Sequence, residues 1–146
     1  MIDLWPSELS TVDQRSPLTI LKEQASLLGE KTQNIVIAEL EYTPPAGGWR
    51  QNNYPFKYGF LLTCPALGNY RFGLFSIAYD IEMYPVSFIL DSDVAEEIIE
   101  QTHLEPGMNG ELKASNEEEF IEILKRIFSS RKTARVIRAL LSQAKS

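Results

Sequence analysis

The chain has 146 residues, of which 44% are hydrophobic and 23% charged, and its formal net charge is −6. This composition is ordinary for a globular protein and argues against disorder, and the length suits one domain. The single Cys excludes an intrachain disulfide and fits a reducing compartment, so we expect a cytoplasmic protein. No apolar run approaches the ~20 residues that span a bilayer, and the first residues lack the basic and apolar regions of a signal peptide.

The charged residues are sorted along the chain. Residues 125–146 hold seven of the 14 Lys and Arg and no Asp or Glu, whereas residues 91–122 hold eleven acidic residues and one basic residue, Lys113. Such asymmetry suggests a charged partner. Because an acidic average disfavours nonspecific binding to nucleic acid, we expect that partner to be another protein.

The N-terminal part of the chain predicts an arm followed by a helix. Residues 1–15 show no regular hydrophobic period and contain Pro6, which predicts an extended arm before a single domain over residues 16–146. Ser16 and Pro17 are typical of the N-cap and the first position of a helix. Apolar residues follow at helical spacing, at Leu18, Leu21, Ala25 and Leu28, and Gly29 is expected to end the helix.

The middle of the chain has the two-residue period of β-strands. Residues 34–42 are rich in Ile, Val and Ala, and aromatic residues recur at alternate positions in residues 54–64 and 70–79. A fourth strand is predicted over residues 84–90. Because turn-rich segments join these runs, we expect an antiparallel meander, to which residues 111–114 add a fifth, short strand.

Helical signals return after the strands. The Asp91-Ser92-Asp93 cap predicts a helix over residues 94–101, and Ser115 with Glu118 predicts a capping box for a second helix. The residues that this second helix is expected to bury are Phe120, Ile121, Leu124, Ile127 and Phe128. In a last helix over residues 132–144 the apolar face is formed by Val136, Ile137, Leu140, Leu141 and Ala144. Helices segregated over an antiparallel sheet indicate the α+β class, with an N-terminal helix and two to three C-terminal helices packing on four to five strands.

The last helix is the first candidate binding surface. Arg131, Arg135 and Arg138 recur at spacings of four and three, on a face distinct from the apolar one. A basic amphipathic helix can bind an acidic protein groove, an anionic membrane surface or a nucleic-acid backbone, and we favour the protein. The competing interpretation is that the acidic segment 91–122 neutralises these cations within the fold.

The loop over residues 44–53 is the preferred contact site. It carries Trp49 and Arg50 directly after a Gly pair. Trp and Arg are enriched at the energetic centres of protein interfaces, and loops present such residues to partners. The alternative is a Trp49 side chain that folds back over the edge of the sheet.

The alternating aromatic residues offer a second kind of site. Tyr54, Tyr58 and Phe60 lie at even positions of one predicted strand, together with Phe56. An open aromatic face can stack on nucleotides or line an apolar ligand pocket. A face packed beneath helices is the simpler interpretation of the same pattern.

Catalytic motifs are poorly represented. His103 is the only His, Cys64 falls on the aromatic face where Cys is typically a small buried hydrophobe, and the Asp80/Glu82 and Asp91/Asp93 pairs fit turns and a cap. No cofactor or metal is therefore predicted.

The function we expect is a noncatalytic protein-interaction module, of the kind of a small acidic adaptor, immunity-type protein or chaperone-like protein. The alternative is a small-ligand or nucleotide-binding module. Self-association into a homo-oligomer is compatible with either, because acidic and basic surfaces of two copies can meet.

Overall fold

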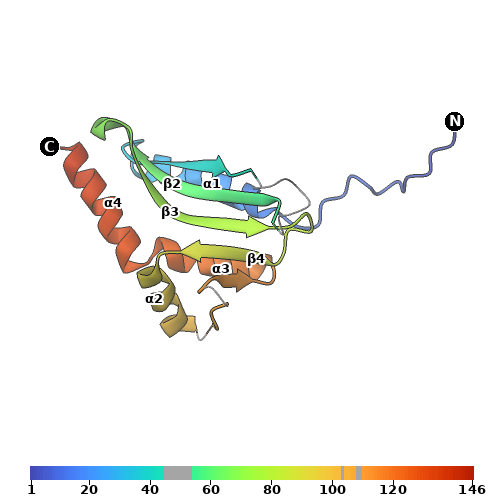
Figure 1. Ribbon diagram of the computed structural model, residues 1–146. Helices are drawn as coiled ribbons and strands as arrows, with labels where there is room; N and C mark the ends of the chain where they lie inside the picture. The colour runs from blue at the N-terminus through green and yellow to red at the C-terminus, as the bar shows by residue number, and fades with distance from the viewer. Residues whose placement is uncertain (45–53, 103, 108–109) are drawn as a thin grey trace.

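The computed structural model describes the whole chain except residues 45–53, 103 and 108–109 (Figure 1). Within the described residues one antiparallel sheet holds five strands, each paired with the next along the chain. The strands are β1 (Ile37–Tyr42), β2 (Phe56–Cys64), β3 (Tyr70–Tyr79), β4 (Val86–Leu90) and β5 (Leu112–Ala114). The helices are α1 (Pro17–Lys31), α2 (Ser92–Thr102), α3 (Glu117–Phe128) and α4 (Arg131–Ala144). The predicted α+β fold, an antiparallel meander with N- and C-terminal helices, is therefore confirmed.

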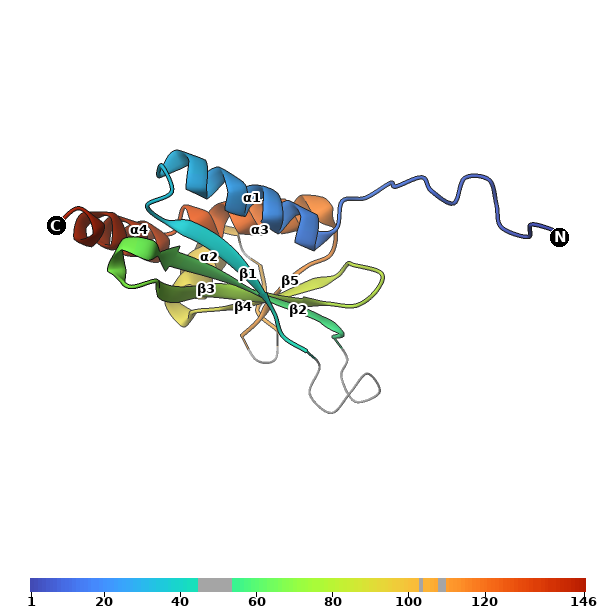
Figure 2. The same cartoon turned by 90° about the horizontal axis from the view of Figure 1, so that it is seen from above.

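The helices α1 and α3 lie side by side on one face of the sheet, and α4 continues from α3 toward the end of the β2–β3 hairpin (Figures 1 and 2). The arm before α1 runs away from the body in both views, and every residue from 1 to 15 is exposed. The alternating residues Phe60, Leu62 and Cys64 of β2 point toward the helices and are buried. The aromatic face of this strand is thus mainly a core face, as the simpler interpretation expected.

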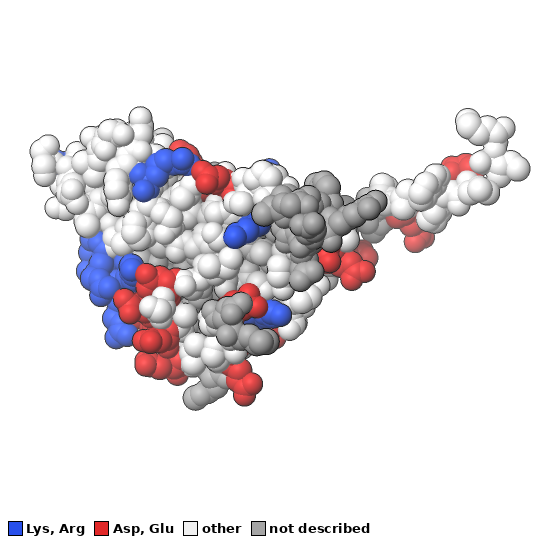
Figure 3. Space-filling model, viewed as in Figure 1, with Lys and Arg blue, Asp and Glu red and all other residues white. Residues whose placement is uncertain are grey.

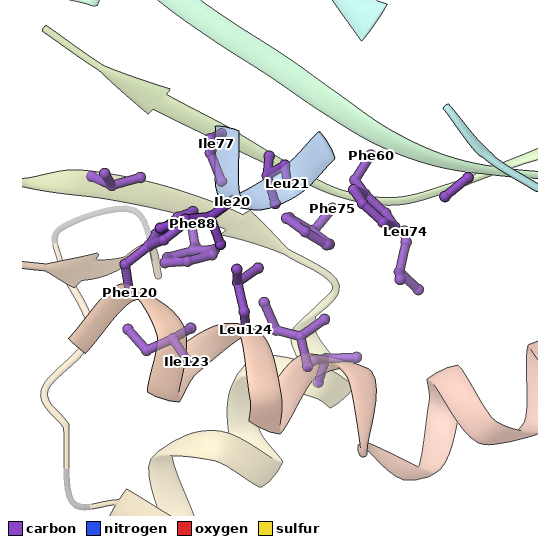
Figure 4. Packing of buried hydrophobic residues seen from close by; sticks show 14 of the residues in the cluster. Ile20, Leu21, Phe60, Leu74, Phe75, Ile77, Phe88, Phe120, Ile123 and Leu124 are labelled. Atoms are coloured by element: carbon purple, nitrogen blue, oxygen red, sulfur yellow. The ribbon is translucent and has the colours of Figure 1, made fainter. Parts of the chain in front are cut away.

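The core between sheet and helices consists mainly of Leu, Ile and Val side chains packed around a group of Phe rings (Figure 4). The rings of Phe88 on β4 and Phe120 on α3 stack with their centroids 5.3 Å apart. The rings of Phe60 and Phe75 stack at 5.1 Å, and Phe128 at the end of α3 packs against both. These contacts hold α3 on the sheet and set the position of α4, which follows after two residues.

A β-bulge in the β2–β3 pair adds one more apolar residue to the helix-facing side. Phe60 pairs with Phe75, but the next residue, Leu61, pairs with Gly73, so Leu74 has no partner across the ladder. A bulge of this kind changes the alternation of side chains along the strand. As a result both Leu74 and Phe75 are buried on the helix side, and Leu74 is available to the space beneath α1.

Two expectations about α3 were wrong. Its N-cap is Asn116, whose side chain accepts a hydrogen bond from the Glu119 N–H (2.8 Å), while Glu119 accepts one from the Ser115 N–H (2.8 Å). The capping box therefore sits one residue later than predicted. The buried stripe of α3 includes Ile123, and Ile121 is 39% exposed, because the side of α3 that bears Ile121 faces α1 rather than the sheet.

Candidate functional site

The predicted interaction residues are distributed over three parts of the fold. Trp49 and Arg50 lie outside the described residues, so the loop hypothesis stays a prediction. Arg131, Arg135 and Arg138 all lie on α4 and reach its surface. In Figure 3 their helix forms the basic edge at the left of the molecule, directly beside acidic residues of α2.

The first turn of α4 is partly neutralised from within the fold. The Arg131 Nε atom lies 2.7 Å from Glu97 Oε1, and the Arg131 backbone N–H donates to both Glu97 oxygens at 3.3 Å. Lys132 Nζ donates to Asp91 Oδ2 at 2.6 Å. This bond, together with one from the Asp93 backbone N–H, holds the pKa of the Asp91 carboxyl below its usual range. The acidic segment therefore offsets Arg131 and Lys132, as the competing interpretation anticipated.

The later arginines of α4 are differently placed. Arg135 lines a polar cavity of about 310 Å³ with Glu96, Glu97 and Glu100 of α2. Within the described part of the chain, neither Arg135 nor Arg138 takes part in an ion pair. The three arginines consequently do not form one uniform cationic stripe, because acidic residues lie beside two of them.

The aromatic candidates do not form one open site. Phe60 is 2% exposed beneath the helices, whereas Tyr58 is half-buried and burial raises the pKa of its hydroxyl. Tyr54 precedes β2 and accepts a hydrogen bond from Ser87 Oγ at 3.4 Å, on the opposite face of the sheet. Desolvation also raises the pKa of Tyr79 to about 12, beside Tyr58. These aromatic side chains are therefore partly or fully buried and lie on both faces of the sheet.

The described catalytic candidates have structural roles. Cys64 is fully buried, and His103 lies outside the described residues. Asp80 accepts a hydrogen bond from the Ile81 N–H and Asp91 one from the Asp93 N–H, which are turn and cap roles. Among the described residues no group of three or more His, Cys, Asp or Glu side chains is arranged to hold a metal ion.

The most distinctive concave surface lies between α1 and the α3–α4 pair. One cavity of about 210 Å³ has an apolar floor from the sheet and apolar walls from the helices. Its apolar lining is Leu27, Leu28, Phe60, Leu62, Leu74, Phe128 and Ile137. A second cavity, of about 420 Å³, adjoins it and shares Gln24 and Phe128; its further apolar lining is Ile20, Ile121 and Leu124. We refer to the two together as the α1 groove.

The charged residues that line the α1 groove are all basic. They are Arg15, Lys31 and Lys125, and none of the described acidic residues lines either cavity. Arg15 is already paired with Glu23 at 2.8 Å and lies 3.8 Å from Glu117. Lys31 and Lys125 have no ion-pair partner among the residues that the structure describes. The groove therefore combines apolar surface with two unpaired positive charges at its rim.

Sequence reasoning did not single out this groove. The spacing of apolar residues in α1 predicts one core stripe, but Leu27 is 43% exposed and faces the groove. A signal was present: Leu27 lies beside Leu28, so the apolar arc of α1 is wider than a single stripe on the sheet requires. Ile121 on α3 is a second apolar residue outside the buried stripe.

No helix in the described part of the chain combines the length and the apolar character needed to cross a membrane. Comparison with known proteins gives no match of this chain to a protein-family model, to a curated protein or to a solved structure.

Proposed function

We propose that this protein is a noncatalytic protein-interaction module whose α1 groove binds an apolar, acidic segment of a partner protein. The observation that carries the proposal is the groove itself, an apolar trough with Lys31 and Lys125 unpaired, among the described residues, at its rim. Exposed apolar surface in a concave site favours burial of a partner's apolar side chains. The single buried Cys64 fits a reducing, cytoplasmic setting for this interaction.

The chemistry of the partner follows from the rim. Lysine ammonium groups attract carboxylates and repel basic residues, so they select against a basic segment as well as for an acidic one. The apolar side chains supply most of the affinity, because burial of each Leu- or Ile-sized side chain contributes about 1.5–3 kcal/mol. A partner with Asp or Glu next to spaced Leu, Ile or aromatic residues satisfies both requirements.

A small apolar ligand is the second candidate, and the position of Phe60 on the floor of one cavity favours it. That cavity, of about 210 Å³, is smaller than the roughly 300–1,000 Å³ of typical small-molecule sites. Side chains of a partner segment can use both adjoining cavities at once. We therefore place the protein segment first.

Selection of peptides tests the proposal. A displayed library of random peptides would be selected on the full chain, and binding of the selected peptides measured by calorimetry. We expect them to carry spaced apolar residues with Asp or Glu and few Lys or Arg. Leu27→Asp should weaken their binding at least about tenfold, since it removes one apolar anchor and places a carboxylate in the trough.

Two variants of α1 at exposed positions outside the lining of the groove serve as matched controls. Ser26→Asp adds the same charge to the adjacent residue, and Lys22→Glu matches the charge reversal Lys31→Glu. Ser26→Asp and Lys22→Glu should leave the affinity unchanged, whereas Lys31→Glu should weaken it. Selected peptides that bind the Leu27→Asp and Ser26→Asp variants equally well would contradict the groove as the binding site.

A further inference from the structure

The N-terminal arm presents apolar side chains that the described part of the chain leaves uncovered. Leu4 is 89% exposed and Trp5 is 72% exposed. The other large apolar residues of the arm beyond Met1 are Ile2, Leu9 and Val12, and all are exposed. An exposed run of this kind is typical of a segment that docks on another surface, and its hydrophobic content differs from that of permanently disordered chains.

The charges of the arm match those of the α1 groove. Residues 1–14 contain Asp3, Glu8 and Asp13 and no Lys or Arg. The groove is apolar and carries Lys31 and Lys125 at its rim. The arm thus has the composition proposed for the partner segment, with acidic residues interspersed among Leu, Ile and Trp.

At Arg15, where the arm joins the folded body, the backbone directs the arm away from the groove of its own chain. The Arg15 backbone N–H donates to Glu117 Oε1 at 2.9 Å, and the Tyr84 hydroxyl donates to the Arg15 carbonyl at 3.3 Å. These two bonds fix the backbone where the arm begins. From there the arm points outward, while α1 and the groove extend in the opposite direction (Figure 2). To fill its own groove the chain would have to reverse immediately before Arg15.

We propose that the arm of one copy docks in the α1 groove of a second copy, so that two chains exchange arms across a two-fold axis. This inference rests on the proposed function, because it uses the same groove, and it names a regulation of it: the arm of a second copy competes with the partner segment. In such a reciprocal exchange both arms are docked and both grooves are occupied, so the assembly closes at two chains.

The mass of the full chain as a function of concentration tests this proposal. Sedimentation equilibrium should show a monomer–dimer equilibrium at micromolar concentrations. The double substitution Leu4→Ser/Trp5→Ser should weaken the dimer at least about tenfold, and so should Leu27→Asp, because each removes apolar contacts from the docked arm. Ser7→Ala/Ser10→Ala in the arm and Ser26→Asp on α1 are the controls, and both should dimerise like the unmodified chain.

Charge reversal adds a readout that a general loss of folding does not reproduce. Lys31→Glu/Lys125→Glu should weaken the dimer, and a second set of changes in the arm, Asp3→Lys/Glu8→Lys/Asp13→Lys, should restore it when both sets are present in one chain. With Trp49→Phe as background, Trp5 emission should shift to shorter wavelength as the dimer forms, because its indole leaves water.

Two results would overturn the arm exchange. One is a monomer at all concentrations that still binds selected peptides in a Leu27-dependent way; the proposed function then stands without the exchange. The other is Trp5 emission that is already blue-shifted in the dilute monomer, which would place the arm in its own groove. A dimer that Leu27→Asp dissociates, combined with no selected peptide that binds, supports the exchange and contradicts the binding of other proteins.

Discussion

Phe88→Ala should lower the free energy of unfolding by about 4 kcal/mol, within the range of about 3–5 kcal/mol for removal of a buried Phe side chain. Phe88 is completely buried at the junction of the sheet and α3, where its ring stacks on Phe120 and approaches Phe75 at 6.1 Å. Truncation removes the apolar contacts of the ring and leaves a cavity that the flanking strands cannot close. Denaturant unfolding followed by circular dichroism measures the loss.

Two companion variants distinguish the effect of losing the Phe88 ring from the effect of any substitution in β4. Phe88→Leu keeps most of the buried volume and should lose considerably less stability than Phe88→Ala. Ile89→Ala changes the next residue, which is 46% exposed on the opposite face, and should lose less than about 1 kcal/mol. If Phe88→Ala and Ile89→Ala lost similar stability, the helix-facing core described for β4 would be wrong.

Glu97→Ala should lower the free energy of unfolding by about 2 kcal/mol, since hydrogen bonds to a charged group contribute about 1.5–3 kcal/mol. Its carboxylate ties α2 to α4, because it accepts from the Arg131 backbone N–H and faces the Arg131 side chain at 2.7 Å. The residue is 9% exposed. The Glu97 carboxylate also lies at the N-terminus of α4, where a negative charge adds about 0.3–1 kcal/mol to the stability.

The neighbouring Glu96 provides the control for Glu97. It is exposed on the same helix, and Glu96→Ala should change stability by less than about 0.5 kcal/mol. Glu97→Gln retains an acceptor without the charge and should fall between the two. Hydrogen exchange should also accelerate in the first turn of α4 for Glu97→Ala. Equal stability of the Glu96→Ala and Glu97→Ala variants would show that the carboxylate does not anchor α4.

The fold was readable from the sequence because local signals and global arrangement agree in most elements. The period of two in β2 and β3 and the Ser16-Pro17 start of α1 led directly to the observed elements. The sequence pattern predicts the start of β1 too early, at residue 34, because Gln33 and Asn34 adopt left-handed backbone conformations (φ 51° and 62°) before the strand begins at Ile37. Such conformations have only a weak sequence signature outside Gly.

The candidate site was less readable, for a different physical reason. Periodicity identifies the apolar face of a helix but not the neighbour that covers it. Ile121 and Ile137 belong to the predicted apolar faces, yet both line a groove, because α1 and the α3–α4 pair leave space between them. Ion pairs such as Arg131 with Glu97 join segments 34 residues apart, and no local spacing predicts which acidic residue meets which basic one.

The most direct test of the α1 groove as a binding site is a methyl NMR titration of the full chain with the tightest selected peptide. The methyl groups of Leu27, Ile121 and Ile137 report on the groove. Ile89, on the face of β4 opposite Phe88, is an internal reference of similar exposure to Leu27. We predict saturable shifts at the three groove residues and none at Ile89. Shifts at Ile89 with an unperturbed groove would contradict the proposed function.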